Sequence, residues 1–373
     1  MATKYAEGFL AVKYRSIDEE GHVLGGPFYY IERGMGAKWK PLALLFAFLG
    51  GVATAGGIGT ATQINGICDT VKNLVDPDSK YMLSLGSLEY SWCVVVVSIV
   101  LSIVLIIILA GGLKRVSQFA EVVVPIMAVI YIGYCIAILV FNVGSIPKAF
   151  YNVFVGAFNP AAITGGAIGS FFVVMQTGIA RSVFSGELCL GSAPIAAAAA
   201  KTNDPVKQGL ITMTSNFVVF LICTCTGIAI VATDSWNVGL NGVSVTTRAF
   251  QMGLPFVPKT LVNLIMMLCL AFFAFTTIVG WEYYGERCWE YLFNGSKRAC
   301  IFYRVLYILI CFIGAYLSVS TIWTISNILC GLMAFPNMIA LLMLIKDVAH
   351  DTKKYFTSDK PVEPVSVSSD EAN

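Results

Sequence analysis

Charged side chains are scarce in this chain of 373 residues. Asp, Glu, Lys and Arg make up 12% of it, and hydrophobic residues make up 57%. A soluble domain has about 25% charged residues. The composition therefore excludes an ordinary soluble protein and predicts an integral membrane protein. The net charge of +2 is too small to favour nucleic acid as a partner.

Motifs for catalysis, cofactors and metals are also missing. The two histidines, His22 and His350, lie in the terminal segments, and the chain has no GxSxG, no HExxH and no phosphate-binding glycine loop. The eleven cysteines form no CxxC pair, and we interpret them as small core residues. No signal peptide is visible in residues 1–40. We therefore expect neither an enzyme nor a bound cofactor, and the sequence does not specify metal ligands.

Long runs without charge are what the chain has instead. A bilayer core about 30 Å thick needs a helix of about 20 residues. The charge-free run 305–345 is long enough for two helices with a tight turn near Ser318–Ser320. The segment 188–200 is too short to cross and predicts a re-entrant or interfacial helix. The runs predict eight spans, at 41–66, 91–112, 118–142, 165–182, 208–232, 260–283, 301–319 and 322–345.

The basic residues predict the orientation. With eight spans, 19 of the 24 Lys and Arg residues fall on the side of the two termini. This imbalance predicts a multi-pass protein of the plasma (inner) membrane with both termini in the cytoplasm. We expect a cytoplasmic segment at 1–40, formed by the end of a missing span and a loop. A transmembrane domain with eight spans is expected at 41–350 and a disordered cytoplasmic tail at 351–373.

Polar side chains within the first predicted span are the first candidates for a site. The sequence "GGVATAGGIGTATQINGIC" contains glycines 50, 51, 56, 57 and 59, which allow helices to approach closely. Gln63 and Asn65 follow at membrane depth. They are either hydrogen-bonding links between helices or ligands for a substrate or ion.

A second group of polar residues lies in "AFFAFTTIVGWEYYGE". Thr276 and Thr277 either bond to their own helix backbone or, with Trp281, form a small polar site. Hydroxyl oxygens suit a hard cation such as sodium. Glu282 and Glu286 are expected at the interface on the cytoplasmic side.

The third group lies around "IARSVFSGELCLGSAPIAAAAAK". Glycines 165, 166, 169 and 178 predict a weakened helix, and a broken helix near the midplane is a device by which transporters bind substrate and ion. Arg181 and Glu187 are either a cytoplasmic gate or an ordinary interfacial ion pair.

The sequence resembles a known family through "MATKYAEGFLAVKYR", "GGPFYYIERGMG", "ARSVFSGELCLGSAPIAAAAAKTNDPVKQGL" and "FAFTTIVGWEYYGE". These segments are similar to those of the alanine or glycine:cation symporters, also called sodium:alanine symporters. The resemblance implies an all-α helical bundle of the five-plus-five inverted-repeat type. It also implies symport of a small neutral amino acid, alanine or glycine, with Na+ or H+ across the lipid bilayer.

The resemblance further implies site residues. The pocket glutamine of the family matches Gln63, the aromatic and serine of its "ARG.FSNE" motif match Phe184 and Ser185, and its threonine and tryptophan match Thr276 or Thr277 and Trp281. The usual "FSNEAGLGSA" is "FSGELCLGSA" here, with Gly186 in place of an Asn. Family members also carry further helices before "MATKYAEG", so we expect about the first three spans to be absent.

Three functional hypotheses follow from these observations. The leading one is a secondary active transporter that couples alanine or glycine to sodium. The alternatives are a non-transporting membrane remnant of such a symporter and, third, a passive channel, for which neither a ring-forming filter nor repeated charged positions are evident.

Overall fold

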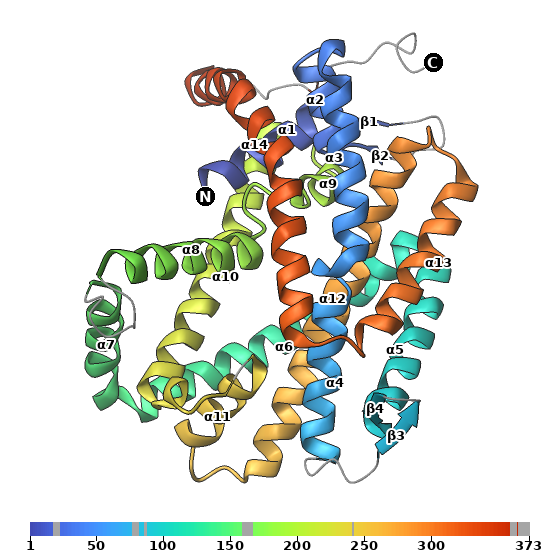
Figure 1. Cartoon of the computed structure of the whole chain (residues 1–373). Coiled ribbons are helices and arrows are strands. Elements are labelled where there is room, and N and C mark those ends of the chain that lie inside the picture. The colour runs from blue at the N-terminus through green and yellow to red at the C-terminus, as the bar shows by residue number, and fades with distance from the viewer. Residues whose placement is uncertain are drawn as a thin grey trace.

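The computed structural model describes residues 1–17, 23–76, 82–85, 88–158, 167–240, 242–358 and 364. Almost all regular structure in this part is helical (Figure 1). The α-helices are α1 (Ala2–Lys13), α2 (Pro27–Gly34), α3 (Lys40–Ala53), α4 (Ala61–Val75), α5 (Trp92–Ala110), α6 (Gly112–Phe141), α7 (Ile146–Phe158), α8 (Ala167–Gly186), α9 (Ala193–Ala198), α10 (Pro205–Ala232), α11 (Val243–Gly253), α12 (Lys259–Leu292), α13 (Lys297–Gly314) and α14 (Val319–Ser358).

Short elements connect the helices. A π-helical turn, η2 (Thr54–Ile58), joins α3 to α4, and three 3-10 turns lie at η1 (Ala37–Trp39), η3 (Val143–Ser145) and η5 (Ser235–Asn237). Two small antiparallel hairpins complete the described part: β1 (Ser16–Ile17) with β2 (Val23–Leu24), and β3 (Met82–Leu85) with β4 (Leu88–Ser91). The sequence had predicted neither hairpin, because each has only two to four residues per strand.

Six helical stretches of the described residues are long and apolar enough to cross a membrane: Ala37–Val75, Trp92–Leu109, Ala120–Phe141, Pro205–Ala232, Lys259–Leu292 and Val319–Thr357. They coincide with six of the eight predicted spans. The other two are helical as well. However, α13 carries Lys297, Arg298 and Arg304 among its 18 residues, and this charge keeps it out of the six.

The predicted span at 165–182 corresponds to α8. Its first predicted residues, 165 and 166, lie outside the described part of the chain, so the span stays a prediction. In Figure 1, α8 runs across the direction of α12 and α14 instead of alongside them.

The centre of the bundle is formed by α3, α4, α12 and α14, which lie side by side (Figure 1). Glycines on α3 and in the turn that follows it make this packing close, as the sequence predicted. A Cβ on Gly50 would lie 2.8 Å from Cys288 Sγ, and one on Gly51 would lie 2.6 Å from Trp289 Nε1. Small residues therefore bring α3 against α12 at a distance that no larger side chain permits.

Residues 1–17 begin the segment 1–40, which the sequence predicts to be the end of a span followed by a cytoplasmic loop, and this assignment stays a prediction. Helix α1 is mostly buried and packs along α10 and α9. A Cβ on Gly8 would lie 2.4 Å from Thr212 Oγ1, and one on Gly209 would lie 3.0 Å from Tyr5 O. Lys4 and Glu7 of α1 are buried, which the local sequence pattern does not show because their surroundings come from other helices.

The C-terminal boundary also differs. Helix α14 continues to Ser358, so residues 351–358 are helical and do not belong to a tail. Asp351 forms an ion pair with Lys13 at 2.7 Å, and Thr352 Oγ1 lies 2.6 Å from Tyr5 Oη. These contacts to α1 stabilise the last turns. The predicted tail beyond residue 358 lies outside the described residues, apart from residue 364.

Candidate functional site

The interruption between α3 and α4, residues Thr54–Gly59, is one candidate site. We name it the α3–α4 break. Gly57 has φ of 141°, which an L side chain rarely adopts. Two freed carbonyls are bonded by hydroxyls of the next turn: Thr60 Oγ1 donates to Ala55 O, and Thr62 Oγ1 donates to Gly57 O, both at 2.9 Å. The interruption therefore falls within the glycine-rich stretch of the predicted span 41–66.

Trp281 of α12 closes one side of this break. The side chain is buried, and a Cβ on Gly59 would lie only 2.1 Å from Trp281 Cβ. Tyr307 Oη donates to Ile278 O at 2.7 Å and lies 3.4 Å from Gly59 O. Ser326 Oγ, on α14, is buried without a hydrogen-bond partner and would lie 3.0 Å from a Cβ on Gly57.

The other predicted residues near the break have local partners. Thr276 Oγ1 bonds to Phe272 O and Phe273 O, and Thr277 Oγ1 bonds to Phe273 O. Gln63 is half-buried one turn after the break. Asn65 Nδ2 donates to Leu317 O at 3.1 Å and so links α4 to the turn before α14.

The position of Glu282 and Glu286 at the interface on the cytoplasmic side stays a prediction, and the structure shows their surroundings inside the bundle. Both are buried. Arg304 of α13 bonds Glu286 with two hydrogen bonds, of 2.7 Å from Nε and 2.8 Å from Nη2, and its Nε lies 3.8 Å from Glu282. The charges are tolerated inside the bundle because a bidentate arginine compensates them.

The second broken region follows α8. The predicted interruption lies not among the described residues of 165–182 but at residues 187–192, between α8 and α9. Glu187, Cys189 and Gly191 all have positive φ there, at 48°, 61° and 80°. Such left-handed residues are costly unless Gly, and they cluster at functional sites. A Cβ on Gly178, in the middle of α8, would contact nothing within 4 Å.

Arg181 and Glu187 do not pair in this structure. The Arg181 guanidinium lies over the Trp323 ring, with Cζ 4.1 Å from the centroid. Phe184 packs against the same ring, at 5.0 Å between centroids. Glu187 Oε2 instead accepts a hydrogen bond of 2.7 Å from Ser192 Oγ. The two predicted gate residues therefore serve different contacts, one to α14 and the other within 187–192.

A buried polar network holds residues 187–192 in place. Asn337 of α14 donates to Glu7 Oε1 at 2.8 Å and to Cys189 O at 2.9 Å, and it accepts a hydrogen bond from Tyr30 Oη. The Gly191 amide also donates to Glu7 Oε1, at 3.1 Å. Four separate segments thus meet at one amide and one carboxyl group. The sequence analysis missed this network.

Burial dominates the electrostatics of Glu7. It raises the pKa of the Glu7 carboxyl from 4.5 to about 7, although the nearby Lys4 and the two hydrogen-bond donors lower it. Glu7 Oε2 is buried and has no hydrogen-bond partner. The signal in the sequence was a Lys and a Glu three residues apart in a short apolar helix, which places both on one face.

A cavity of about 440 Å³ lies beside this network, and we name it the α1–α10 cavity. Its wall is mostly polar or small, and it includes two predicted residues, Ser185 and Glu187. The lining residues are Lys4, Ser185, Gly186, Glu187, Ala193, Ala196, Ala197, Gln208, Ile211, Thr212, Ser215, Asn216, Val219 and Tyr284. Tyr284 connects the cavity to Trp281, whose ring lies 5.7 Å away.

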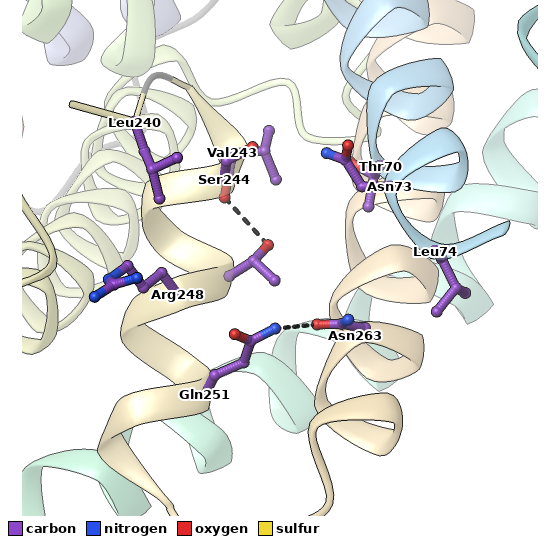
Figure 2. Close-up of a pocket in the computed structure, with 10 residues that line it drawn as sticks. Thr70, Asn73, Leu74, Leu240, Val243, Ser244, Arg248, Gln251 and Asn263 are labelled. Carbon is purple, nitrogen blue, oxygen red and sulfur yellow. Dashed lines mark hydrogen bonds between the residues drawn. The ribbon is translucent and has the colours of Figure 1, made fainter. Parts of the chain in front are cut away.

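A smaller cavity of about 240 Å³ lies between the ends of α4, α11 and α12 (Figure 2). Gln251 Nε2 donates to Asn263 Oδ1 at 2.5 Å across its wall. Arg248 points away from α4 in this view. None of the predicted site residues lines this cavity, so it is the weaker candidate.

Comparison of the sequence with known proteins identifies the family. The model of the sodium:alanine symporter family matches residues 1–367. The chain belongs to the sodium:alanine symporter family. It is therefore a multi-pass membrane protein and a sodium-coupled amino-acid transporter by family, as predicted.

Several individual proteins are similar to this chain over most of its length. An uncharacterized transporter of Haemophilus influenzae is 44% identical over 359 residues, which cover 95% of this chain and 74% of the relative. The sodium/alanine symporter AgcS of Methanococcus maripaludis is 39% identical over 364 residues, with 95% and 74% covered. The amino-acid carrier protein AlsT of Bacillus subtilis is 33% identical over 363 residues, with 96% and 71% covered.

Two expectations need comment after this match. The family model covers the chain from its first residue, so the match does not support the expected loss of N-terminal spans. The inverted repeat stays a prediction. The departure at Gly186 has a structural counterpart, because a Cβ there would lie 2.8 Å from Asn216 Oδ1. An amide from α10 therefore fills the space beside Gly186.

Proposed function

We propose that this chain carries a small neutral amino acid, alanine or glycine, across the plasma membrane together with sodium or a proton. The similarity to a protein named as a sodium/alanine symporter supports the substrate class. The bias of Lys and Arg supports the proposed orientation, with both termini in the cytoplasm.

The α1–α10 cavity is the observation that carries the proposal. Its volume of about 440 Å³ is within the usual range for small-molecule sites. It is bordered by the left-handed segment 187–192, and transporters bind substrates where helices are interrupted. The α3–α4 break with Gln63, Thr276, Thr277 and Trp281 is the proposed neighbouring region for substrate or ion.

Uptake into proteoliposomes tests this function. The reconstituted chain should take up radiolabelled alanine saturably under an inward sodium gradient, and excess unlabelled glycine should compete. Replacing sodium by potassium at constant pH should abolish uptake if sodium is the coupling ion, and an inward proton gradient should restore it if protons substitute. Absence of uptake under both gradients would support the non-transporting alternative, and flux without saturation would support a channel.

Reporter fusions test the orientation separately. Fusions at Asn373 and in the loop at 237–240, between α10 and α11, should report opposite sides of the membrane. Reporters on one side would overturn the predicted arrangement of spans.

A further inference from the structure

Two buried carboxyl groups of α12 share one arginine of α13. Glu282 and Glu286 lie one helical turn apart and are only 3% and 5% exposed. Arg304 gives its two hydrogen bonds to Glu286, at 2.7 Å from Nε and 2.8 Å from Nη2. Its Nε stays 3.8 Å from Glu282 Oε1, which is beyond hydrogen-bonding distance. Arg304 therefore compensates Glu286 directly and Glu282 only at longer range.

The second guanidinium of this region, that of Arg287, is also engaged elsewhere. Its Nη1 lies 2.5 Å from Glu290 Oε2, and its Nη2 lies 3.4 Å from Glu286 Oε1. Glu282 Oε1 is buried and has no hydrogen-bond partner among the described residues. An ionised carboxylate in such a position would be costly, because a buried charge needs close partners.

The tyrosine hydroxyls of α13 that face Glu282 are already used. Tyr303 Oη lies 2.6 Å from Thr54 Oγ1, which in turn donates to a carbonyl of α3, so Tyr303 donates to Thr54. Tyr307 Oη donates to Ile278 O at 2.7 Å. Neither hydroxyl proton is therefore left to compensate the Glu282 carboxyl.

Charged residues of the other helices that pack against this end of α12 have other surroundings. Lys40 of α3 lies 3.2 Å from Glu32. Asp69 and Lys72 of α4 interact with each other. The two basic residues at 297–298, which begin α13, are exposed. The charge of the buried carboxyl pair thus depends on Glu286 and the two guanidinium groups.

The side chains of Glu282 and Glu286 lie within hydrogen-bonding reach of each other. Ionised carboxylates only accept hydrogen bonds, so a hydrogen bond between two carboxyl groups requires a proton on one of them. A nearby positive charge favours the ionised form of a carboxyl group. Both guanidinium groups contact Glu286, so the proton belongs on Glu282.

We propose that Glu282 and Glu286 form a proton-binding site, in which Glu282 holds the proton and donates it to the Glu286 carboxylate while Arg304 holds Glu286. The bond that forms is the O–H bond of Glu282, and its proton comes from water and returns to water. The inference goes beyond the proposed function, because this proton is bound between α12 and α13 and is not assigned to transport. Loss of the proton would place a second carboxylate beside Glu286 and weaken this contact between the helices.

Infrared spectroscopy of the purified chain at neutral pH tests the proposal, because a protonated carboxyl group has a carbonyl band that a carboxylate lacks. Glu282→Gln should remove one acid band. Glu286→Gln should remove it as well, since the remaining carboxyl then ionises opposite Arg304. The matched control Glu121→Gln changes an exposed residue and should keep the band.

Glu7 needs a separate control, because its pKa of about 7 gives it an acid band of its own near neutral pH. Glu7→Gln identifies that band, and the band of Glu282 should remain in this variant. The two carboxyl groups also contribute separately to the pH dependence of stability, and each Gln variant removes its own contribution.

Thermal unfolding at pH 7 gives a second measurement that does not depend on the spectra. Glu282→Gln replaces a neutral acid by a neutral amide that still donates to Glu286, so it should unfold at the native temperature or above. Glu286→Leu removes both acceptors of Arg304 and should unfold at a lower temperature.

Three results would overturn the site. The first is an unchanged acid band in Glu282→Gln, and the second is an unfolding temperature of Glu282→Gln as low as that of Glu286→Leu. Either would mean that both carboxyl groups are ionised. The third is a band that is present in potassium but absent in sodium, which would assign the position to a sodium ion. None of these measurements depends on transport, so the site and the proposed function succeed or fail separately.

Discussion

The α3–α4 break and the α1–α10 cavity both depend on glycine, yet they bury different surfaces. At the break, glycines pack against side chains of α12, and the hydroxyls of Thr60 and Thr62 donate to the backbone carbonyls that the interruption frees. Around the cavity, glycines bring α1 and α10 together, but the surfaces that meet carry Lys4, Glu7 and Glu187.

The two regions should respond differently when the helices on either side of them move apart. A dry seam of glycine and aromatic side chains resists separation, because any gap loses packing on both sides. A seam that contains charged side chains is stabilised when water or ions enter it, because charged groups are costly to desolvate. We therefore expect the α3–α4 break to act as the stable part of the bundle and the α1–α10 seam to respond to ligand and pH.

The largest change in stability should come from replacing Asn337 of α14, which bonds Glu7 of α1 and the backbone of Cys189. Asn337→Leu removes donors from Glu7 and Cys189 O and the acceptor from Tyr30. Several buried groups are then left unbonded, each at about 1–3 kcal/mol, so we expect a loss of about 4 kcal/mol in unfolding free energy. Thermal unfolding in detergent measures it.

The control is Asn327→Leu, on the same helix at an exposed position. It should leave the unfolding temperature almost unchanged. Equal unfolding temperatures for the two variants would show that the network at Asn337 contributes nothing to stability.

The next effect tests the dry seam. Gly59→Ala places a methyl group 2.1 Å from Trp281 Cβ. This Cβ is bonded to the backbone of α12, so a change of side-chain rotamer does not move it away. Overpacking of this kind costs about 3 kcal/mol. In α4, the helix that follows the break, Gly66→Ala meets nothing within 4 Å and should stabilise the helix by up to about 1 kcal/mol. If Gly59→Ala and Gly66→Ala both destabilise the protein, the loss does not come from the contact with Trp281, and the glycines are needed for the backbone conformation instead.

These two regions also show how far the sequence alone reaches. Glycines 50, 51, 57 and 59 predicted the close packing of helices, whereas a broken helix was predicted only for 165–182. The lengths of the charge-free runs predicted six spans that the structure also has. The predicted spans that correspond to α8 and α13 are not among these six.

The charged region was less predictable. The burial of Lys4 and Glu7 was not predicted, because burial of a charge depends on partners that lie far along the chain. Asn337 lies 330 residues from Glu7, and nothing in the local pattern joins them. The sequence predicted a polar interruption around residues 187–192, but it predicted the helix break within 165–182. The left-handed backbone at Glu187 and Cys189 was not predictable, because non-glycine residues rarely adopt it.

A smaller effect should appear in the pH dependence of stability. Glu7 has a pKa of about 7 in the folded chain, raised by burial from 4.5. The folded state therefore binds more protons than the unfolded state between these values, so stability falls as pH rises from about 4.5 to 7. The slope approaches about 1.4 kcal/mol per pH unit.

Glu7→Gln should remove this slope and be more stable than the native chain above pH 7, since the amide oxygen still accepts from Gly191 and Asn337. Lys4, Glu187, Tyr30 and Cys189 face Glu7 and stay in place in this comparison. Unfolding followed at several pH values measures both chains, with Glu121→Gln as a control that keeps the slope. An unchanged slope in Glu7→Gln would assign the pH dependence to another group.

The smallest effect should come from the threonines of the dry seam. Thr276 and Thr277 bond only to carbonyls of their own helix in the described structure, so Thr276→Ala and Thr277→Ala leave no unbonded partner on another helix. Alanine is also the better helix former. We expect each change to alter the unfolding free energy by less than about 0.5 kcal/mol. A loss of several kcal/mol would show that the hydroxyls bond across helices.

Because we expect the stability of these variants to stay unchanged, sodium-dependent uptake tests the proposed role of Thr276 and Thr277 at a sodium or substrate site. If a hydroxyl binds sodium, its alanine variant needs more sodium for half-maximal uptake and its serine variant, Thr276→Ser or Thr277→Ser, does not. Equal sodium dependence in the alanine and serine variants would return both threonines to packing.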